Sequence, residues 1–349
     1  MPELPQVPAA RTHRVRVTEV VAETADARSF VLAPADGVLA YRPGQFLTLR
    51  LPGPDGGAAA RCYSLASSPH SGEPMKITVK RVAGGHGSNW LCDHIGVGDE
   101  LEVLAPAGTF GSGPLDGDLL LAAAGSGITP VISLAKAALA GSQGRVVLLY
   151  ANRDESAVIF RDELRALAAA HPRRLLVLHW LETLDGLPSA DRLTALLGPY
   201  AGHRAYLCGP APFMDAVDEA LRAAGAAPAA IHRERFFSLT GDVFRTSPAA
   251  AAQPAAGGAA SRAVVELDGE THDVTWGATT PLLDALLAAG IDAPYSCREG
   301  SCAACACRVV EGEVTVVHDD VLDDEDRADG YVLACQALPA SERISISYS

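Results

Sequence analysis

Long hydrophobic runs are missing from this sequence: nowhere do about 18 apolar residues follow one another, as a membrane-spanning helix requires. The opening segment, MPELPQVPAARTHR, has no apolar stretch that could serve as a secretory signal peptide. We therefore expect a cytoplasmic protein with no membrane partner. Because disulfides are disfavoured in a protein that is not secreted, the eight cysteines are expected to serve another purpose.

Positive charge is scarce in the last quarter of the chain. Residues 263–349 contain 17 Asp and Glu against 4 Arg, a net charge of −13, whereas the rest of the chain has 25 acidic against 24 basic residues, or −1. This asymmetry argues against nucleic acid as a partner, because its phosphates would be repelled. It predicts a separate acidic module, which either attracts a partner by electrostatic steering or presents a merely solvated surface.

The composition is otherwise ordinary for a globular protein, with 48% hydrophobic and 20% charged residues. A chain of 349 residues exceeds the usual size of one domain, so two or three domains are expected. The clearest linker signal is TSPAAAAQPAAGGAAS at 246–261, which has neither charge nor apolar periodicity. We predict domains at 12–113, 116–237 and 263–349, with a linker at 238–262.

The pattern of apolar residues changes along the chain. Residues 14–110 contain short β-branched runs separated by Gly and Pro turns, which predicts an antiparallel β-barrel. Between 119 and 236, apolar runs alternate with Ala- and Leu-rich segments, which predicts a parallel sheet with helices on both faces. A hairpin around Asp268-Gly269 is expected after the linker. Helices are expected at 130–140, 161–170, 212–224 and near 280–289.

Four cysteines have the C-x4-C-x2-C…C spacing of plant-type [2Fe-2S] ferredoxins: Cys297, Cys302, Cys305 and Cys335. The short loop SCREGSCAAC can wrap a cluster with its N–H groups turned toward the sulfurs, and the fourth thiolate comes from a distant element. A structural zinc site, the alternative, more often has two C-x2-C pairs. Ala303 departs from the pattern, since such ferredoxins usually have Gly there. Cys62, Cys92 and Cys307 are interpreted as small buried side chains.

Short segments of the first domain resemble the ferredoxin–NADP reductase superfamily: PGQF at 43–46, RCYS at 61–64, VKR at 79–81 and GGHGS at 84–88. Each is weak alone, but their order is that of the superfamily's FAD-binding barrel. The resemblance implies that Arg61 holds the FAD pyrophosphate, that Tyr63 lies against the flavin ring, and that Ser64 is a catalytic hydroxyl near flavin N5. A helix expected from Asn89 would complete the phosphate site. The other FAD-site candidates are Val79, Lys80, Gly87 and Ser88.

The second domain contains GSGITP at 125–130, directly after a predicted strand and before a helix. Glycines permit close backbone approach, and Pro130 suits a first helical turn. The segment is not the G-x-G-x-x-G fingerprint, but it matches the superfamily's nicotinamide domain. A second match is Cys208-Gly209-Pro210, where the resemblance places the cysteine beside the nicotinamide ring as a catalytic residue. Alone, Cys208 would be interpreted as a buried thiol. The glycine-loop candidates are Gly125, Gly127 and Thr129.

Dinucleotide preference is expected to lie in YANRDES at 150–156. Arg153 could pair with the extra phosphate of NADPH. Asp154 or Glu155 could instead accept a hydrogen bond from the free ribose hydroxyl of NADH and repel that phosphate. The signals conflict, and we favour NADH while leaving NADPH open.

The order of FAD barrel, nicotinamide domain, linker and ferredoxin resembles the reductase components of multicomponent oxygenases over essentially the whole chain. Segments such as SNWLCDH, LLYANRD, CGPAPFM and DAPYSCREGSCAACAC are similar to the reductases of 3-ketosteroid 9α-monooxygenases. The resemblance implies a multidomain fold with an antiparallel FAD-binding β-barrel, a parallel α/β nicotinamide-binding domain and a C-terminal β-grasp ferredoxin domain. It also implies electron transfer from NADH through FAD and [2Fe-2S] to a separate Rieske-type oxygenase that hydroxylates a steroid. A monomer is expected.

Nicotinamides deliver two electrons as a hydride, whereas iron–sulfur clusters accept one, so a flavin between them has to divide the pair. Two other interpretations stay open at this point. The client could be a phenylacetyl-CoA epoxidase or another non-haem oxygenase. Alternatively, the chain could be a ferredoxin-like electron carrier or redox sensor with a vestigial flavin site, although the complete RCYS, GSGITP and CGP segments argue against this.

Overall fold

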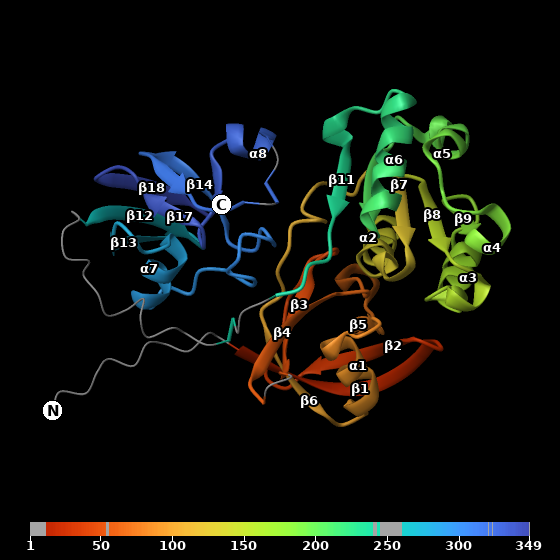
Figure 1. The fold of residues 1–349 in the computed structure, drawn as a ribbon, viewed down its shortest axis with the longest axis horizontal. Helices are drawn as coiled ribbons and strands as arrows, with labels where there is room; N and C mark the ends of the chain where they lie inside the picture. The colour runs from red at the N-terminus through yellow and green to blue at the C-terminus, as the bar shows by residue number, and fades with distance from the viewer. Residues whose placement is uncertain are drawn as a thin grey trace. The chain divides into compact units, whose positions relative to one another are not determined.

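The computed structural model describes residues 12–53, 56–239, 243–244, 260–319, 321–322 and 324–348. The chain divides into two compact units, one comprising His13–Ser238 and the other containing the residues from Leu239 onward (Figure 1). The opening segment and most of the predicted linker lie outside the described residues. No helix in the described part of the chain has the length and apolar character needed to cross a bilayer.

The first half of the larger unit is an antiparallel barrel, as the sequence predicts. Its six strands have the order β4-β3-β6-β1-β2-β5, and a bridge between Leu65 and Ile77 joins the two ends of the sheet. Alternate side chains such as Val15 and Val17 point into the core and are fully buried. The strands are β1 (Thr12–Thr24), β2 (Ala27–Pro34), β3 (Phe46–Pro52), β4 (Ala58–Ser64), β5 (Met75–Lys80) and β6 (Glu100–Leu104), and helix α1 (His86–His94) lies between β5 and β6.

The second half of this unit is a parallel sheet of order β11-β10-β7-β8-β9 with helices on both faces (Figure 1). Helices α2 and α3 pack on one face, and α5 and α6 on the other. Strand β11 was not predicted, but the three helices expected here are confirmed. The elements are β7 (Leu119–Ala124), α2 (Ile128–Gly141), β8 (Val146–Asn152), α3 (Arg161–Ala170), β9 (Leu175–Leu181), α4 (Glu182–Asp185), α5 (Ala190–Leu197), β10 (Arg204–Cys208), α6 (Ala211–Ala223) and β11 (Ile231–Glu234).

The order of the strands determines where a ligand can bind. From β7 the chain proceeds outward through β8 and β9, then returns to the other side of β7 to form β10 and β11. The connections after β7 and after β10 therefore lead away in opposite directions, and the switch point lies between these two strands. In open parallel sheets ligands bind outside the carboxyl ends of the strands at such a switch point.

A buried ion-pair network joins the barrel to the parallel sheet within this unit. Lys136 on α2 is 6% exposed, and its Nζ lies 2.8 Å from a carboxylate oxygen of Glu73 in the barrel. Glu163 on α3 contacts both Lys136 and Lys76, the latter at 2.7 Å. Although burial opposes ionisation, the two ammonium groups lower the pKa of Glu163. These contacts fix the barrel against the sheet, so that a ligand bound to the barrel and a ligand bound to the sheet would keep a constant relative position.

The smaller unit is a mixed sheet packed against helix α7. Strand β12 pairs antiparallel with β13 and parallel with β18, and the sheet has the order β13-β12-β18-β14-β16. Asp268 and Gly269 both take positive φ angles, 51° and 80°, as a tight hairpin turn requires, so the predicted hairpin is confirmed. The elements are β12 (Ser261–Leu267), β13 (Glu270–Trp276), α7 (Leu282–Ala288), β14 (Ala306–Glu311), β15 (Val314–Val316), α8 (Asp324–Ala328), β16 (Tyr331–Leu333), β17 (Ala337–Pro339) and β18 (Arg343–Ser347).

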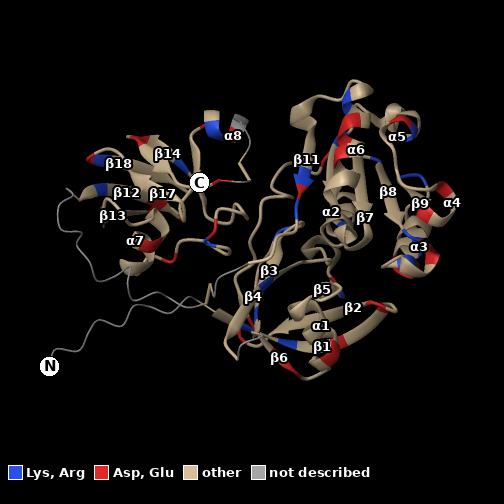
Figure 2. Ribbon diagram, viewed as in Figure 1, with Lys and Arg blue, Asp and Glu red and all other residues tan. Residues whose placement is uncertain are grey.

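Three arginines of the smaller unit pair with acidic side chains of the same unit. Arg262 pairs with Asp273 at 2.6 Å, Arg327 pairs with Asp319 at 3.1 Å, and Arg298 pairs with Asp284. Charged residues are spread over the strands, helices and loops of the unit (Figure 2). The excess of acidic over basic residues leaves the unit strongly acidic, and steering of a basic partner stays a prediction.

Candidate functional site

The FAD-site candidates Arg61, Tyr63 and Ser64 lie on β4, which pairs antiparallel with β3. Arg61 and Tyr63 are two residues apart and therefore share one face of the strand. Burial raises the pKa of the Tyr63 phenol above its ordinary value, which keeps the ring neutral and suited to lie against a flavin. Ser64 is 6% exposed and pairs across the sheet with Phe46, whose ring meets Phe237 edge-on with centroids 6.3 Å apart.

Helix α1 begins at His86, so the expected start at Asn89 is wrong. Gly87 and Ser88 are therefore in the first turn, where backbone N–H groups have no intrahelical partner and can bind an anion. A methyl group on Gly87 would lie 2.8 Å from Cγ of Arg61 and 3.0 Å from Leu51. This close approach brings the arginine and the helix N-terminus together, as a pyrophosphate site requires.

The other FAD-site candidates have more local roles as well. The hydroxyl of Ser88 accepts a hydrogen bond from the Val82 N–H at 3.1 Å. Val79 is fully buried in the barrel core, so only its peptide group can face a cofactor. Lys80 lies 3.8 Å from Asp26, and a methyl group on Gly125 would be 3.8 Å from its Nζ. Lys80 thus places a cation where the barrel meets the glycine loop of the parallel sheet.

The nicotinamide-site candidates converge at the switch point. Gly127 lies so close to the end of β10 that a methyl group would be 2.1 Å from the Cys208 carbonyl oxygen and 2.9 Å from the Gly209 nitrogen. Gly125 has a left-handed φ of 54°, and Thr129 donates to the Ser126 carbonyl at 3.0 Å. Pro130 falls in the first turn of α2, and Pro210 immediately precedes α6, so both loops lead directly into helix N-termini.

A carboxyl group that the sequence did not reveal stands beside Cys208. Glu234 on β11 is opposite Cys208 in the parallel register. Part of its surface is exposed, yet enough protein surrounds it that burial raises the pKa of the carboxyl to about 8. Burial, with Glu234 as a second cause, also raises the pKa of the Cys208 thiol. Burial thus favours the uncharged form of both groups. The sequence could have placed Glu234 beside Cys208 only if residues 231–234 had been recognised as a strand paired with β10.

The stability of the protein should depend on Glu234. The pKa of the Glu234 carboxyl is about 8 in the folded protein and 4.5 in the unfolded chain. The folded state therefore holds this proton more tightly, and the free energy of unfolding falls as the pH rises from 4.5 toward 8. The fall is at most ~1.4 kcal/mol per pH unit. Glu234→Gln should remove this decline and gain stability over the wild type as the pH rises. Urea unfolding from pH 5 to 9 measures it, with the exposed Glu219→Gln as control. A wild-type profile parallel to that of Glu234→Gln would contradict the prediction.

Arg153 and Asp154, the ribose-site candidates that follow β8, form an ion pair with each other. Arg153 Nε lies 3.1 Å from the carboxylate of Asp154. The same carboxylate accepts the Ala157 N–H at 3.2 Å at the start of a short 3-10 helix. Hydrogen bonds from Ser156 and then Arg153 lower the pKa of Asp154, so it remains a carboxylate.

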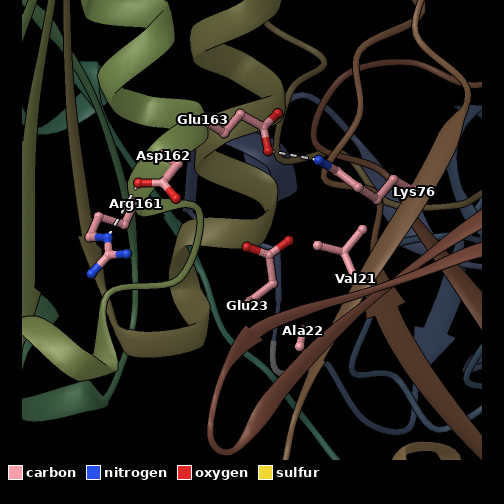
Figure 3. A pocket seen from close by; sticks show the side chains of 7 residues that line it. All are labelled: Val21, Ala22, Glu23, Lys76, Arg161, Asp162 and Glu163. Carbon is pink, nitrogen blue, oxygen red and sulfur yellow. Dashed lines mark hydrogen bonds and ion pairs between the residues drawn. The ribbon is translucent and has the colours of Figure 1, made fainter.

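One pocket of about 270 Å³ lies between β1 and α3 (Figure 3). None of the predicted cofactor residues lines it. Glu23 there accepts the Phe160 N–H at 3.2 Å, and Lys76 pairs with Glu163. Arg161 pairs with Asp162 at 3.4 Å, so each charged group of the pocket has a partner within the protein. We assign the pocket to the junction between barrel and sheet.

The four predicted cluster ligands lie together in the smaller unit, and all are buried. The N–H groups of Glu299 and Ser301 point at the Cys297 sulfur at 3.3 and 3.4 Å. Left-handed φ angles at Arg298, Gly300 and Ala303 turn the loop inward. Ala303, with φ of 51°, accepts a conformation that glycine adopts with less strain. The loop thus has the backbone donors that a cluster needs.

The sulfurs contact one another in pairs. Hydrogen bonds from Cys302 and then Cys335 lower the pKa of Cys297, and Cys335 lowers that of Cys305. The pKa values of Cys302 and Cys335 rise, and for both thiols the largest cause is the hydrogen bond with Cys297. No three His, Cys, Asp or Glu side chains of the described residues converge on a single metal ion. Four thiols in successive pairs fit a two-iron cluster, with two thiolates for each iron.

Cys307 is separate from these four ligands. Burial, with Cys305 as a second cause, raises the pKa of the Cys307 thiol, and a hydrogen bond with Tyr348 opposes the rise. It is completely surrounded by the core of the unit. These observations agree with its interpretation as a small buried side chain.

Gly300→Ala is expected to loosen the cysteine loop, and Gly290→Ala is its matched control. Both glycines have left-handed φ angles, 79° and 78°, so alanine adds a similar strain of ~1–2 kcal/mol at each. Only at Gly300 would the methyl meet main chain, 2.9 Å from the His318 carbonyl; at Gly290 it would meet no described atom within 4 Å. Gly300→Ala should therefore lose iron faster in a chelator, measured by visible absorption. Equal rates in the two variants would contradict this role for the contact with His318.

Comparison with known proteins gives a consistent result for all three sites. Family models match an oxidoreductase FAD-binding domain at residues 13–111, an oxidoreductase NAD-binding domain at 121–219 and a 2Fe-2S iron-sulfur cluster binding domain at 265–340. The ferredoxin reductase component of 3-ketosteroid-9-alpha-monooxygenase from Rhodococcus rhodochrous is 52% identical over 342 residues, covering 97% of each chain. The chain belongs to this family of ferredoxin reductase components.

More distant relatives of these ferredoxin reductase components share the architecture. A component of the 1,2-phenylacetyl-CoA epoxidase from Escherichia coli is 34% identical, covering 96% of this chain and 97% of its own. The crystal structure of CYP116B46 from Tepidiphilus thermophilus superposes with a TM-score of 0.67 at 26% identity, and 99% of this chain covers 43% of that one. The family models confirm FAD, NAD and a [2Fe-2S] cluster as the cofactors and establish the chain as an oxidoreductase.

Proposed function

We propose that this reductase transfers electrons from NADH through FAD and its [2Fe-2S] cluster to a separate Rieske-type terminal oxygenase that hydroxylates 3-ketosteroids. The observation that supports this most strongly is the 52% identity to a 3-ketosteroid-9-alpha-monooxygenase reductase over 97% of the chain, together with the three matched cofactor-binding domains. The chain acts as a cytoplasmic monomer, with the domain boundaries given above. The bound cofactors supply hydride acceptance and single-electron transfer.

The residues of the larger unit hold the reacting rings together. Arg61 and the first turn of α1 would hold the FAD pyrophosphate, and Tyr63 would lie against the flavin. Ser64 would offer a hydroxyl to the reacting edge. Cys208 and Glu234 would line the nicotinamide site, and burial raises the pKa of both groups and so favours their uncharged forms. A wall without a carboxylate would suit hydride transfer, because it would not hold the positively charged nicotinamide ring that the transfer leaves.

The arrangement at β8 favours NADH over NADPH. The cation that could bind a 2′-phosphate, Arg153, is paired with Asp154, and Asp154 is held as a carboxylate that would repel the phosphate. Asp154→Ser should therefore raise the ratio of kcat/KM for NADPH to that for NADH roughly tenfold, or ~1.4 kcal/mol. Glu155→Gln tests the other candidate: it removes the neighbouring charge and leaves the Arg153–Asp154 pair intact, so it should change the ratio less than Asp154→Ser does. A wild-type preference for NADPH would contradict this assignment.

Two measurements test the electron path and the client. Purified protein should absorb as a flavin and an iron–sulfur cluster, and NADH should bleach both features under anaerobic conditions. A preparation free of flavin that still reduces its cluster with NADH would contradict the path. For the client, the reductase is combined with a 3-ketosteroid-hydroxylating Rieske oxygenase and hydroxylated product is measured. Steroid turnover is the expected result, and its absence would contradict the steroid assignment alone.

A phenylacetyl-CoA epoxidase is the second candidate client, because a component of that enzyme is 34% identical over nearly the full chain. Reconstitution with the epoxidase under the same conditions distinguishes the two. We expect product to form faster with the steroid oxygenase than with the epoxidase, since the identity to a 3-ketosteroid-9-alpha-monooxygenase reductase is 52%.

A further inference from the structure

The carboxamide of Gln336 is a polar group beside the cysteines that the sites described so far do not use. Gln336 directly follows Cys335, the cysteine that comes from outside the cysteine loop. Its Nε2 donates a hydrogen bond to the Cys335 sulfur at 3.6 Å and another to the Arg298 carbonyl oxygen at 3.2 Å. A primary amide has two N–H protons, so each acceptor can receive its own. Gln336 therefore joins the fourth cysteine to the loop that contains the other three.

The two acceptors determine which end of the carboxamide faces them. A carbonyl oxygen such as that of Arg298 can only accept a hydrogen bond. Cysteine binds a metal as the thiolate, which has no proton to donate, so the Cys335 sulfur can also only accept. The nitrogen of the Gln336 carboxamide, and not its oxygen, must therefore be turned toward both groups.

The main chain holds the Gln336 carboxamide in place. The Gln336 N–H donates to the Leu333 carbonyl at 2.8 Å, and the Gln336 carbonyl accepts from the Val317 N–H at 2.9 Å. The side chain lies against the cysteine loop, because a methyl group on Gly300 would be 3.2 Å from the Gln336 Cγ. Such outer partners of a metal site orient the ligands and tune the metal.

Cys335 differs from two cysteines of the loop in the source of its donor. Main-chain N–H groups of Glu299 and Ser301 point at the Cys297 sulfur, and the Cys297 N–H points at the Cys302 sulfur. These donors remain whatever side chain occupies the position. The donor to Cys335 belongs to a side chain, so a single substitution can remove it.

A hydrogen bond to a ligand sulfur favours the reduced form of an iron–sulfur cluster. The cluster takes up one electron, and the added negative charge strengthens the attraction between the sulfur and an N–H donor. Hydrogen bonds to the sulfurs are among the factors that set the reduction potentials of such clusters. The carboxamide keeps its protons throughout, so no bond is made or broken at Gln336.

We propose that Gln336 raises the reduction potential of the [2Fe-2S] cluster by donating a hydrogen bond to the Cys335 sulfur. Plant-type clusters have low potentials, so this shift favours electron transfer from the flavin to the cluster. Gln336 acts through Cys335, so it is a positioning residue and takes no part in hydride transfer. The inference rests on the cluster of the proposed function and is independent of which oxygenase receives the electron.

Gln336→Met tests the inference, because methionine has a similar length and no N–H group in its side chain. The holoenzyme is titrated potentiometrically, and the electron paramagnetic resonance signal of the reduced cluster is followed. Only molecules that hold a cluster give this signal, so its midpoint does not depend on how much iron the variant retains. The midpoint should fall by about 40 mV, a roughly fivefold change in the one-electron equilibrium constant at 59 mV for each tenfold.

The flavin provides an internal reference in the same titration. Its midpoint, recorded by visible absorption, should equal that of the wild type, because the flavin site belongs to the other compact unit. A fall in the cluster midpoint alone is a result that general damage to the protein would not give.

Two further variants complete the experiment. Gln336→Glu keeps the shape of the side chain but replaces the donor with a carboxylate oxygen, so it should lower the cluster midpoint further than Gln336→Met does. Thr315→Val is the matched control. Thr315 is an exposed residue on β15, which pairs with β17 directly after Gln336, and its substitution should leave the midpoint unchanged.

The outcomes separate this inference from the proposed function. Wild-type protein that contains no iron, or gives no signal of a reduced cluster, would contradict the proposed electron path. If the wild type gives the signal and both Gln336 variants have its midpoint, the inference alone is wrong. An equal fall in Thr315→Val would also overturn it, since the shift would not depend on the donor. Should Gln336→Met retain no cluster, the midpoint of Gln336→Glu decides on the same terms.

Discussion

Cys302→Ser is expected to abolish electron delivery to a terminal oxygenase while leaving NADH oxidation at the flavin largely intact. Cys302 is buried in the loop whose sulfurs contact one another in pairs, and it accepts the Cys297 N–H at 3.4 Å. Removing one of four thiolates leaves an iron with an incomplete set of ligands. The flavin and nicotinamide sites belong to the other compact unit, so they should keep their structure.

The measurement compares two acceptors. Ferricyanide reports electron transfer from the flavin, whereas turnover of the oxygenase requires the cluster. Because serine oxygen can ligate iron, Cys302→Ala is measured alongside, with iron content and visible absorption for each variant. Cys307→Ala, a buried cysteine outside the four ligands, is the matched control and should retain two irons. Full oxygenase turnover by Cys302→Ala, or loss of iron in Cys307→Ala, would contradict the ligand assignment.

Gly127→Ala should reduce hydride transfer from NADH by about a hundredfold, because a shift of roughly 1 Å in the reacting groups has that effect. A methyl group at this position would lie 2.1 Å from the carbonyl oxygen of Cys208, and main chain cannot move aside as a flexible side chain can. The loops after β7 and β10 would have to separate, and these two loops form the proposed nicotinamide site. The effect should appear in both kcat and KM.

Gly141→Ala is the control for this experiment. Gly141 is at the other end of the same helix, α2, and a methyl group there would meet no described atom within 4 Å. It should have the kcat/KM of the wild type with ferricyanide as acceptor. Anaerobic stopped-flow measurement of flavin bleaching by NADH separates the hydride step from later ones. Wild-type rates in Gly127→Ala would show that the two loops do not jointly form the site.

Much of the architecture could be predicted from local sequence. The C-x4-C-x2-C spacing indicates a cluster loop because the ligands are close in the chain, and their geometry depends on a few backbone angles, such as the left-handed φ at Gly300. The barrel and the parallel sheet were recognisable because alternating and continuous apolar runs reflect burial on one face or on both. The predicted start of α1 is wrong by three residues, because Gly87 and Ser88 give a weak helix signal. In the structure Gly87 fits in the first turn, where it packs closely against Arg61.

By itself the sequence determined which cofactors the chain binds, because each binding loop is a short contiguous segment whose chemistry can be read from neighbouring residues. Only the tertiary structure decided how those loops meet: that Gly127 touches Cys208, and that Glu234 lies opposite the thiol on the neighbouring strand. These residues are far apart in the chain or lie on strands with no distinctive composition. Their burial and their pKa values depend on long-range packing, which a linear pattern does not contain.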